Sequence, residues 1–264
     1  MGKVAGLSEF TKQYGPVALV TGASSGIGKS FAESLAAQGF DLVLVARRLA
    51  RLEALAGELR SEHGIEVAVH RVDLADGGAA QQILAATSSL DVGLVVSNAG
   101  IGDRGRFESG DASAMAETLM VNCNTPMLLA HGYVPRLKAR GQGGIIFTSS
   151  VEGLIGCPFS TVYSASKGFV NSLGEGLWGE LSPDGIDVLT LCPGATATER
   201  LEQVDPATLH NVMSPEEVVR LALENIRNGP TYIPSEHYRQ TFDRLLSMPR
   251  DQALSAMAKQ MNKG

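Results

Sequence analysis

Short apolar runs alternate with longer segments of helical periodicity along most of this chain. The apolar runs predict strands at 17–20, 42–46, 67–72, 93–97, 145–148, 188–192 and 231–233. Most of them are apolar at every position, which is typical of parallel strands covered on both faces. The alternation therefore predicts an α/β fold, a single Rossmann-type doubly wound parallel β-sheet flanked by helices on both faces.

Helical periodicity fills the intervals between these runs. It predicts helices at 27–38, 50–61, 111–139 and 161–181, and one from Ser214 that stops before Gly229. Gly39 and Gly64 follow the first two, and glycine commonly ends a helix. Ser214, Pro215 and Glu217 have the order of an N-cap, a first-turn proline and a capping-box glutamate.

The regular alternation ends near residue 198. The segment 199–213 has no clear period and is expected to form a substrate loop that closes over the site as a lid. The residues from 249 to 264 predict a C-terminal helical tail that packs on the body or on a partner subunit, since helical spacing relates Leu254, Met257, Ala258 and Met261. One domain over 1–264 is expected, because a sheet covered on both faces accommodates this length.

Composition and charge argue against several classes of protein. The formal net charge is −6 and the basic residues are scattered, which gives no support to nucleic-acid binding. Cys123, Cys157 and Cys192 are too few and too dispersed for a disulfide framework or a zinc site, so we expect no metal and a reducing compartment. Residues 1–15 lack the apolar run of a signal peptide, and no segment approaches the roughly 20 apolar residues of a membrane span. A soluble cytoplasmic protein is expected.

The segment 21–28 reads Thr-Gly-Ala-Ser-Ser-Gly-Ile-Gly and separates the first predicted strand from the first predicted helix. Gly22, Gly26 and Gly28 permit backbone N–H groups and a helix N-terminus to approach a phosphate closely. An ordinary tight turn gives the same pattern, but its place at the start of a βαβ unit favours a dinucleotide site. The other residues of this segment in the predicted cofactor site are Ser24, Ser25 and Ile27.

Two arginines follow the second predicted strand, where many dinucleotide sites carry an acid that binds the ribose 2′-hydroxyl. Arg47 is expected to pair with a 2′-phosphate, while Arg48 stacks or adds positive charge. The alternative is that both are solvated charges at a helix start, although cations there oppose the helix dipole. The pair therefore predicts NADP as the cofactor in preference to NAD.

The next two predicted strands also end in polar or small residues. Asp73 and Leu74 follow the third strand, and Asn98, Ala99 and Gly100 follow the fourth, so both groups lie at the carboxyl edge of the sheet, where ligands bind. Asp73 is expected to accept a hydrogen bond from the adenine amino group or to cap the next helix. The segment after the fourth strand is expected to shape the backbone beside the adenosine ribose, with a plain turn as the alternative.

Tyr163 and Lys167 are four residues apart and share one face of the predicted helix. A free phenol has a pKa of about 10, and a nearby ammonium favours its ionised form, so the pair is able to exchange a proton with an alcohol or ketone. Ser150 ends the fifth strand and is expected to hydrogen-bond the substrate oxygen, with Ser149 as its competitor. Asn122 lies within a predicted helix, where an amide is a poor helix former; it holds a water beside Lys167 or makes a plain polar contact.

Together these segments resemble the short-chain dehydrogenase/reductase family, in its NADP-preferring subgroup. The matching motifs are the glycine segment 21–28, the Asn-Ala-Gly of 98–100, the Tyr163 to Lys167 motif and the Pro-Gly at 193–194. They occur in the family's order over residues 17–198. The separation of Ser150 and Tyr163 is also similar to the family's. Ser25 departs from the pattern, because some NADP-using members carry a basic residue there.

The resemblance implies the roles of the site residues. Asn122, Ser150, Tyr163 and Lys167 form a catalytic tetrad, in which Tyr163 is the acid/base and Ser150 orients the carbonyl. Lys167 binds the nicotinamide ribose and lowers the pKa of Tyr163, while Asn122 holds a relay water. Residues of the Pro-Gly segment complete the cofactor site, with the last of them at the nicotinamide carboxamide: Pro193, Gly194, Thr196 and Thr198.

The expected function is NADP-dependent hydride transfer to or from a small or medium apolar ketone, an aldehyde or a sterol-like substrate. Its pocket is expected to include Leu154, Cys157 and Phe159 together with Ser150 and Tyr163. One alternative is a 3-oxoacyl-carrier-protein reductase, for which Arg136, Lys138 and Arg140 are the candidate docking residues. Another is a dinucleotide sensor without catalysis.

The family resemblance also implies a homodimer or homotetramer. The expected contacts are the helices over 111–139 and 161–181. Four glycines of the second helix would permit close approach of a partner: Gly168, Gly174, Gly176 and Gly179.

Overall fold

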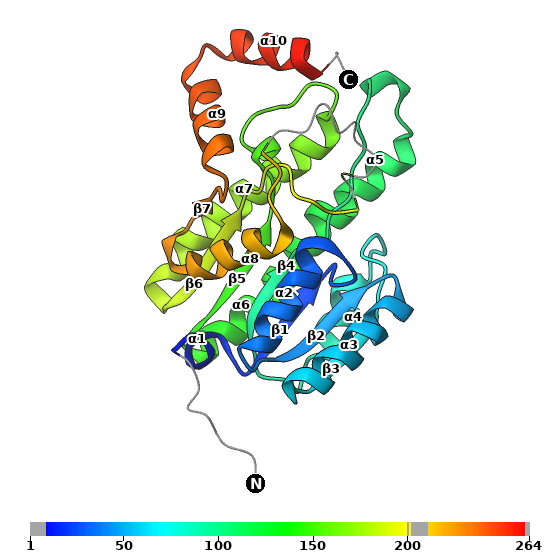
Figure 1. Cartoon of the computed structure of the whole chain (residues 1–264), viewed down its shortest axis with the longest axis vertical. Coiled ribbons are helices and arrows are strands. Elements are labelled where there is room, and N and C mark those ends of the chain that lie inside the picture. The colour runs from blue at the N-terminus through cyan, green and yellow to red at the C-terminus, as the bar shows by residue number, and fades with distance from the viewer. Residues whose placement is uncertain (1–8, 200, 202–210, 262–264) are drawn as a thin grey trace.

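The computed structural model describes residues 9–199, 201 and 211–261. A seven-stranded sheet runs through its centre in the order β3-β2-β1-β4-β5-β6-β7, and every strand pair is parallel (Figure 1). The bounds differ from the predicted ones by no more than two residues. The strands are β1 (Val17–Thr21), β2 (Asp41–Ala46), β3 (Val67–Arg71), β4 (Val92–Ser97), β5 (Gly143–Thr148), β6 (Ile186–Leu191) and β7 (Thr231–Tyr232).

Helices cover both faces of this sheet, which confirms the predicted doubly wound α/β fold. Alternate strand residues divide the core: Val20 and Leu44 pack towards one layer of helices, and Leu19 and Val43 towards the other. The first layer contains α2 (Gly26–Ala37), α3 (Leu49–His63) and α8 (Pro215–Glu224). The second contains α4 (Ala79–Ala86), α6 (Thr125–Arg140) and α7 (Thr161–Leu181).

Several short elements lie outside these two layers. A helix precedes the first strand, and single 3-10 turns lie in four of the connections. These elements are α1 (Glu9–Tyr14), η1 (Phe107–Ser109), η3 (Val151–Gly153), η4 (Ser182–Asp184) and η7 (Ile226–Asn228).

The helix predicted over 111–139 is interrupted. α5 (Ala112–Leu119) and α6 are joined by one turn of π-helix, η2 (Met120–Asn124). Asp111 caps the start, because its side chain accepts the Ser113 N–H. A π turn widens the helix locally and is frequent at functional sites. Here it contains Asn122, which is 1% exposed and so points into the protein.

The glycines of α7 do not all face outward. A side chain on Gly174 would overlap the Thr190 hydroxyl of β6, so this glycine allows α7 to lie close to the sheet. Gly176 and Gly179 have open space beside them. The expectation that Gly174 serves a subunit contact is therefore corrected, whereas Gly176 and Gly179 remain available to a partner.

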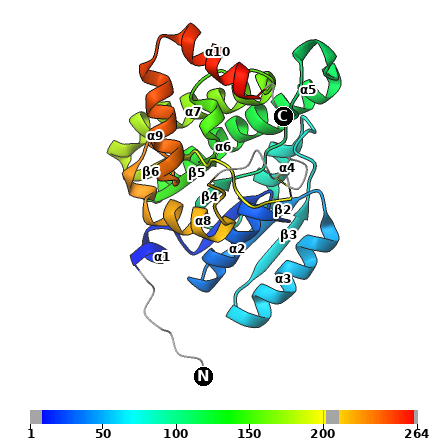
Figure 2. The ribbon, with the colours of Figure 1, turned by 45° about the horizontal axis from the view of Figure 1, so that its top comes forward.

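Two helices near the C-terminus lie beyond the carboxyl edge of the sheet, at the end of the molecule away from α1 (Figures 1 and 2). They are α9 (Glu236–Ser247) and α10 (Arg250–Met261). Phe242, Ala253 and Met257 from these helices pack with Val151 and Cys192 in a separate apolar cluster. The predicted tail at 249–264 contains α10, while α9 was not predicted. Most of the predicted substrate loop at 199–213 lies outside the described residues.

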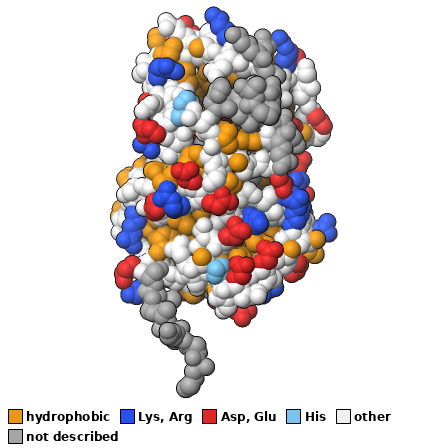
Figure 3. Space-filling view, in the orientation of Figure 1, with side chains coloured by type: hydrophobic (Ala, Val, Ile, Leu, Met, Phe, Trp, Pro, Cys, Tyr) orange, Lys and Arg blue, Asp and Glu red, His pale blue; other side chains and the backbone are white. Residues whose placement is uncertain are grey.

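None of the helices within the described ranges is long and apolar enough to cross a membrane. On the face that Figure 3 shows, acidic and basic side chains are interspersed. Such mixing produces no strong field of one sign on this face.

Candidate active site

The carboxyl edge of the sheet opens into a cavity of about 1140 Å³. Most residues predicted for the cofactor and the substrate line it, although they come from distant parts of the sequence. Those lining residues are Gly22, Ser24, Ser25, Gly26, Ile27, Arg47, Arg48, Asp73, Leu74, Asn98, Ala99, Gly100, Ser150, Phe159, Tyr163, Lys167, Pro193, Gly194, Thr196 and Thr198.

The glycine segment forms a tight cradle at one side of this cavity. Gly22 has a φ of +68°, and a Cβ atom there would lie 2.9 Å from the Ala99 Cα. A side chain on Gly28 would overlap the Gly22 carbonyl oxygen. Gly28 does not itself line the cavity; its lack of a side chain lets α2 begin directly behind the loop. The cradle and the helix N-terminus fit a dinucleotide pyrophosphate.

Asn98 and Thr21 join the carboxyl ends of β4 and β1. The Asn98 Nδ2 donates to the Thr21 carbonyl oxygen at 3.1 Å, and the Thr21 Oγ1 accepts from the Asn98 and Ala99 N–H groups at 3.0 and 3.2 Å. These bonds fix the turn that borders the glycine cradle. Asp73 accepts the Ala75 N–H at 3.1 Å in the turn after β3 and lines the cavity. It does not cap the next helix, because the N-cap of α4 is Gly78.

Asn122 ties the loop after β4 to α7. Its Oδ1 accepts the Ile101 N–H at 2.9 Å, while its Nδ2 donates to the Ile101 carbonyl at 2.8 Å and to the Ser166 Oγ at 2.9 Å. Both amide hydrogens are therefore used within the protein. A Cβ atom on Gly100 would lie 3.0 Å from the Lys167 Nζ and 3.4 Å from the Asn122 Oδ1, so the space beside Gly100 is bordered by both polar groups.

Lys167 and Tyr163 lie side by side on the cavity face of α7. Lys167 is only 3% exposed, and its Nζ donates to the Thr148 carbonyl at 2.8 Å. The same Nζ lies 5.6 Å from the centre of the Tyr163 ring. A buried ammonium beside a phenol favours loss of the phenol proton, which is the arrangement an acid/base tyrosine needs.

The structure distinguishes the two serines at the end of β5. The Ser149 hydroxyl donates to the Lys167 carbonyl of α7 at 3.0 Å and does so as a structural tie. The Ser150 Oγ accepts the Glu152 N–H at 3.1 Å, which leaves its own hydrogen for another acceptor. Both serines border the cavity, but only the Ser150 hydroxyl keeps a donor for a substrate oxygen in these contacts.

The two arginines after β2 differ in their partners. Arg48 donates through Nε and Nη2 to the Ser24 Oγ at 3.1 and 3.0 Å, and through Nη2 to the Ser25 Oγ at 2.6 Å. Arg47 instead pairs with Glu117 of α5 at 3.3 Å. The structure thus places Arg48 on the glycine segment, whereas the sequence pattern predicts that Arg47 is the main partner of the 2′-phosphate.

One side of the cavity is walled by α9 and α10, for which the sequence predicts no site residue. From α9 and α10 the lining residues are Tyr238, Thr241, Phe242, Leu245, Met257, Gln260 and Met261. The i, i+4, i+7 spacing of Tyr238, Phe242 and Leu245 is the signal that would have found them. The Gly105 N–H donates to the Phe159 carbonyl at 2.8 Å, which joins two loops that also line the cavity.

Two of the predicted pocket residues lie behind this wall. Leu154 and Cys157 pack in the apolar cluster with Phe242 and Met257 and do not line the cavity. Burial raises the pKa of the Cys157 thiol to about 12, so it is protonated at neutral pH. Cys157 supports the wall and has no thiolate chemistry to offer at neutral pH.

A model of the family described as short chain dehydrogenase matches residues 16–208. This chain belongs to the short-chain dehydrogenase family. It is an oxidoreductase enzyme, and the fold and the motif order agree with this assignment.

Individual relatives of this enzyme extend over nearly its whole length. It is 31% identical to a 7beta-hydroxysteroid dehydrogenase of Clostridium sardiniense, covering 95% of this chain and 97% of the relative. A solved structure of a 7beta-hydroxysteroid dehydrogenase superposes with a TM-score of 0.89 at 29% identity, covering 95% and 99% of the two chains. The structure of a short-chain dehydrogenase from Sphingobium yanoikuyae in complex with NADPH superposes with a TM-score of 0.81 at 36% identity. The match covers 91% of this chain and 95% of that chain.

Proposed function

We propose that this enzyme transfers hydride between NADP(H) and an apolar ketone or secondary alcohol, with a bulky, sterol-like substrate as the best fit. The main support is that Ser150 and Tyr163 line the same cavity as the glycine cradle and the apolar side chains of α9 and α10. These apolar side chains, Phe242, Leu245, Met257 and Met261, suit a rigid hydrophobic ketone. The similarity to a 7beta-hydroxysteroid dehydrogenase supports this substrate class.

The side chains at the catalytic end support carbonyl reduction by proton transfer. The Ser150 hydroxyl donates a hydrogen bond to the substrate oxygen and orients it. Tyr163 gives its phenolic proton to that oxygen, and the Lys167 ammonium stabilises the phenolate that remains. NADPH, held by the glycine cradle and the arginine after β2, would supply the hydride that reduces the carbonyl carbon. In the oxidation direction the same groups act in reverse, with Tyr163 as the base.

The space beside Gly100 supports the proton-relay role proposed for Asn122. A Cβ atom on Gly100 would crowd the Lys167 Nζ at 3.0 Å, so the missing side chain leaves Lys167 and the Asn122 Oδ1 accessible to a relay water. Such a water would pass a proton towards Lys167 and Tyr163 after each turnover. Asn122 thus orients both the loop after β4 and the relay.

Arg48, Ser24 and Ser25 support the preference for NADP. Their guanidinium and hydroxyl groups form one cluster beside the end of β2, where dinucleotide sites bind the ribose 2′ position. The similarity to an NADPH complex adds to this support.

The alternative 3-oxoacyl-carrier-protein reductase has less support. Its three candidate docking residues lie on α6 near the opposite edge of the sheet: Arg136 donates to the Thr87 and Leu84 carbonyls, Arg140 pairs with Asp91, and Lys138 pairs with Asp184. These side chains have local partners and are remote from the cavity mouth. Turnover of a 3-oxoacyl thioester remains an outcome of the test below.

We also propose a homodimer or homotetramer in the cytoplasm. Leu119, Met127 and Phe169 are exposed apolar side chains on α5, α6 and α7, the helices expected to form the subunit contact. All three cysteines lie in the described part of the chain and are free thiols, which agrees with a reducing compartment. Light scattering of the purified protein tests the assembly, and a monomer at micromolar concentration would contradict it.

The function is tested by initial rates of NADPH and NADH oxidation against steroid ketones, bulky aryl ketones, small ketones and 3-oxoacyl thioesters. The proposal expects the highest kcat/KM with NADPH and a bulky apolar ketone. Selective turnover of small ketones or thioesters would contradict the substrate class, and equal use of NADH would contradict the cofactor.

A further inference from the structure

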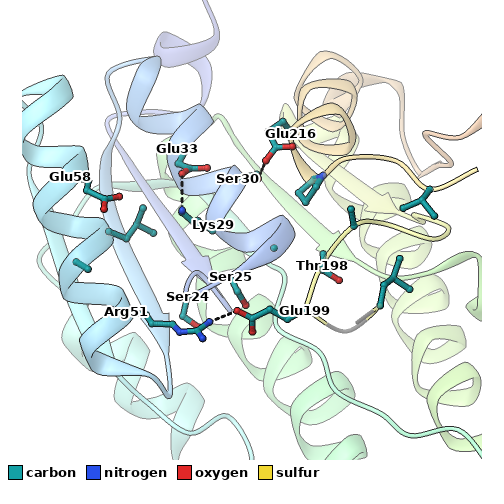
Figure 4. A pocket seen from close by; sticks show the side chains of 17 residues that line it. Ser24, Ser25, Lys29, Ser30, Glu33, Arg51, Glu58, Thr198, Glu199 and Glu216 are labelled. Atoms are coloured by element: carbon teal, nitrogen blue, oxygen red, sulfur yellow. Dashed lines mark hydrogen bonds and ion pairs between the residues drawn. The ribbon is translucent and has the colours of Figure 1, made fainter. Parts of the chain in front are cut away.

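A carboxylate of this chain occupies the arginine cluster at the end of β2. The Glu199 Oε2 lies 2.7 Å from the Arg48 Nη1, and its Oε1 pairs with the Arg51 Nη1. Figure 4 shows Arg51 and Glu199 pointing toward each other across the space beside the glycine segment. Hydrogen bonds from Arg48 and Arg51 lower the pKa of the Glu199 carboxyl, so this group is an anion at neutral pH.

The groups around this carboxylate form a donor set suited to phosphate. Two guanidinium groups converge on it, and the Arg48 guanidinium also bonds the Ser24 and Ser25 hydroxyls. Arginine forks bind carboxylate and phosphate in the same way, but a phosphate monoester carries more charge and a third oxygen. Such a phosphate is therefore able to displace the carboxylate.

The location of the cluster indicates which phosphate would do so. Ser24, Ser25, Arg48 and Glu199 line the same cavity as Tyr163. The cluster lies beside the carboxyl end of β2, where dinucleotide sites bind the adenosine ribose of the cofactor. An acidic side chain at this place is the acceptor that a ribose 2′-hydroxyl uses, so Glu199 suits a cofactor without the phosphate.

We propose that Glu199 is an internal competitor for the 2′-phosphate of NADPH, and that Arg51 belongs to the site for which they compete. The inference rests on the proposed NADP preference and deepens it. A cofactor with a 2′-phosphate displaces the Glu199 carboxylate and pairs with Arg48 and Arg51. A cofactor with a 2′-hydroxyl leaves Glu199 in place.

The test is calorimetric titration with 2′,5′-ADP and 5′-AMP, which probe the adenosine end without turnover. Glu199→Gln is expected to lower the Kd of 2′,5′-ADP by about tenfold. This factor applies if the Glu199 carboxylate occupies the arginine site in about nine-tenths of the molecules without ligand. The Kd of 5′-AMP does not fall. The matched control is Glu58→Gln, because Glu58 lines the neighbouring cavity of about 810 Å³ with Arg51 and Glu199 and forms no ion pair among the described residues. If both variants lower the Kd of 2′,5′-ADP equally, the effect comes from the loss of any nearby negative charge, and the proposal is overturned.

A double-mutant cycle tests the part played by Arg51. Arg51→Ala is expected to raise the Kd of 2′,5′-ADP and to leave the Kd of 5′-AMP within about twofold. In the Arg51→Ala background, Glu199→Gln should improve the affinity for 2′,5′-ADP less than it does in the wild type. Full additivity of the two substitutions would overturn the inference. If the wild type binds 2′,5′-ADP no better than 5′-AMP, the NADP preference itself fails. If it prefers 2′,5′-ADP but Glu199→Gln changes nothing, only the competition fails.

Discussion

The two ends of the proposed cofactor site hold their charges by different physical means. At the catalytic end, Lys167 and Asn122 are almost fully buried and bind backbone groups at fixed distances. At the adenosine end, the side chains of Arg47, Arg48 and Arg51 are between 40% and 57% exposed and pair with carboxylates. Exposed ion pairs contribute little to stability and exchange partners readily, whereas a buried polar network is costly to disturb. The proposed chemistry thus depends on buried groups, while the proposed choice of cofactor depends on exposed groups that are easily changed.

The largest expected effect is that of Tyr163→Phe at the catalytic end. Removing the phenolic hydroxyl removes the proton donor, so kcat should fall by about 10²–10⁴-fold. Steady-state rates with the best ketone measure the loss, and fluorescence titration should find NADPH binding within about twofold of the wild type. Normal binding with full turnover would end the proton-transfer role proposed for Tyr163.

Ser150→Ala and Ser149→Ala distinguish the roles of the two serines at the catalytic end. Loss of the donor at Ser150 should lower kcat by about 100-fold, as for the removal of one oxyanion donor. Loss of the Ser149 hydroxyl removes its bond to the Lys167 carbonyl, so it should cost about 1 kcal/mol of unfolding free energy and little rate. Paired measurements of kcat and thermal unfolding separate the two. The reverse pattern would make Ser149 the catalytic serine.

Arg48→Ala is the corresponding change at the adenosine end. It should raise the KM for NADPH by about tenfold or more and leave kcat and the KM for NADH within about twofold, because only the 2′-phosphate loses its partner. Arg47→Ala should show the same selectivity with a smaller effect, since Arg47 pairs with Glu117. Equal losses with both cofactors would show that these arginines do not read the 2′-phosphate.

The smallest expected effect concerns the apolar layer behind the catalytic end. The pKa of the Cys157 thiol is raised from 9.0 to about 12, chiefly by burial and further by the charge of Glu152. The folded state therefore keeps this proton when the unfolded state loses it, so the stabilisation is complete below pH 9 and is lost as the pH rises towards 12. The melting temperature should fall by about 5 °C between pH 8.5 and 10.5. The melting temperature of Cys157→Ala should fall less over the same pH range. If the wild type and this variant lose the same amount, the raised pKa of Cys157 does not contribute to the pH dependence.

Parallel strands were predictable because their burial on both faces leaves runs such as 42–46 without a polar residue. Motifs at the ends of these strands were equally accessible, since the carboxyl edge of a parallel sheet collects residues from distant segments. The positions of Gly22 and Ser150 at one cavity follow from that rule. Tyr163 and Lys167 join them because they lie in the first two turns of α7, which begins at the same edge.

Other features depend on packing that no local pattern contains. The helical period continues through residues 120–124, so nothing there indicated that a π turn would direct Asn122 inward. Apolar character placed Leu154 and Cys157 near the pocket but did not separate a lining side chain from one behind the wall. Arg47 and Arg48 are adjacent and chemically equal, and only the backbone direction at the end of β2 decides which one reaches Ser24.

The most direct test of the account is the wild-type ratio of kcat/KM with NADPH to that with NADH, measured with a steroid ketone as acceptor. We expect a ratio of about 100 or more, which corresponds to about 2.7 kcal/mol from the charge-assisted hydrogen bonds to the 2′-phosphate. Ketone turnover with a ratio near one would contradict the division between a fixed catalytic end and a cofactor-selecting adenosine end.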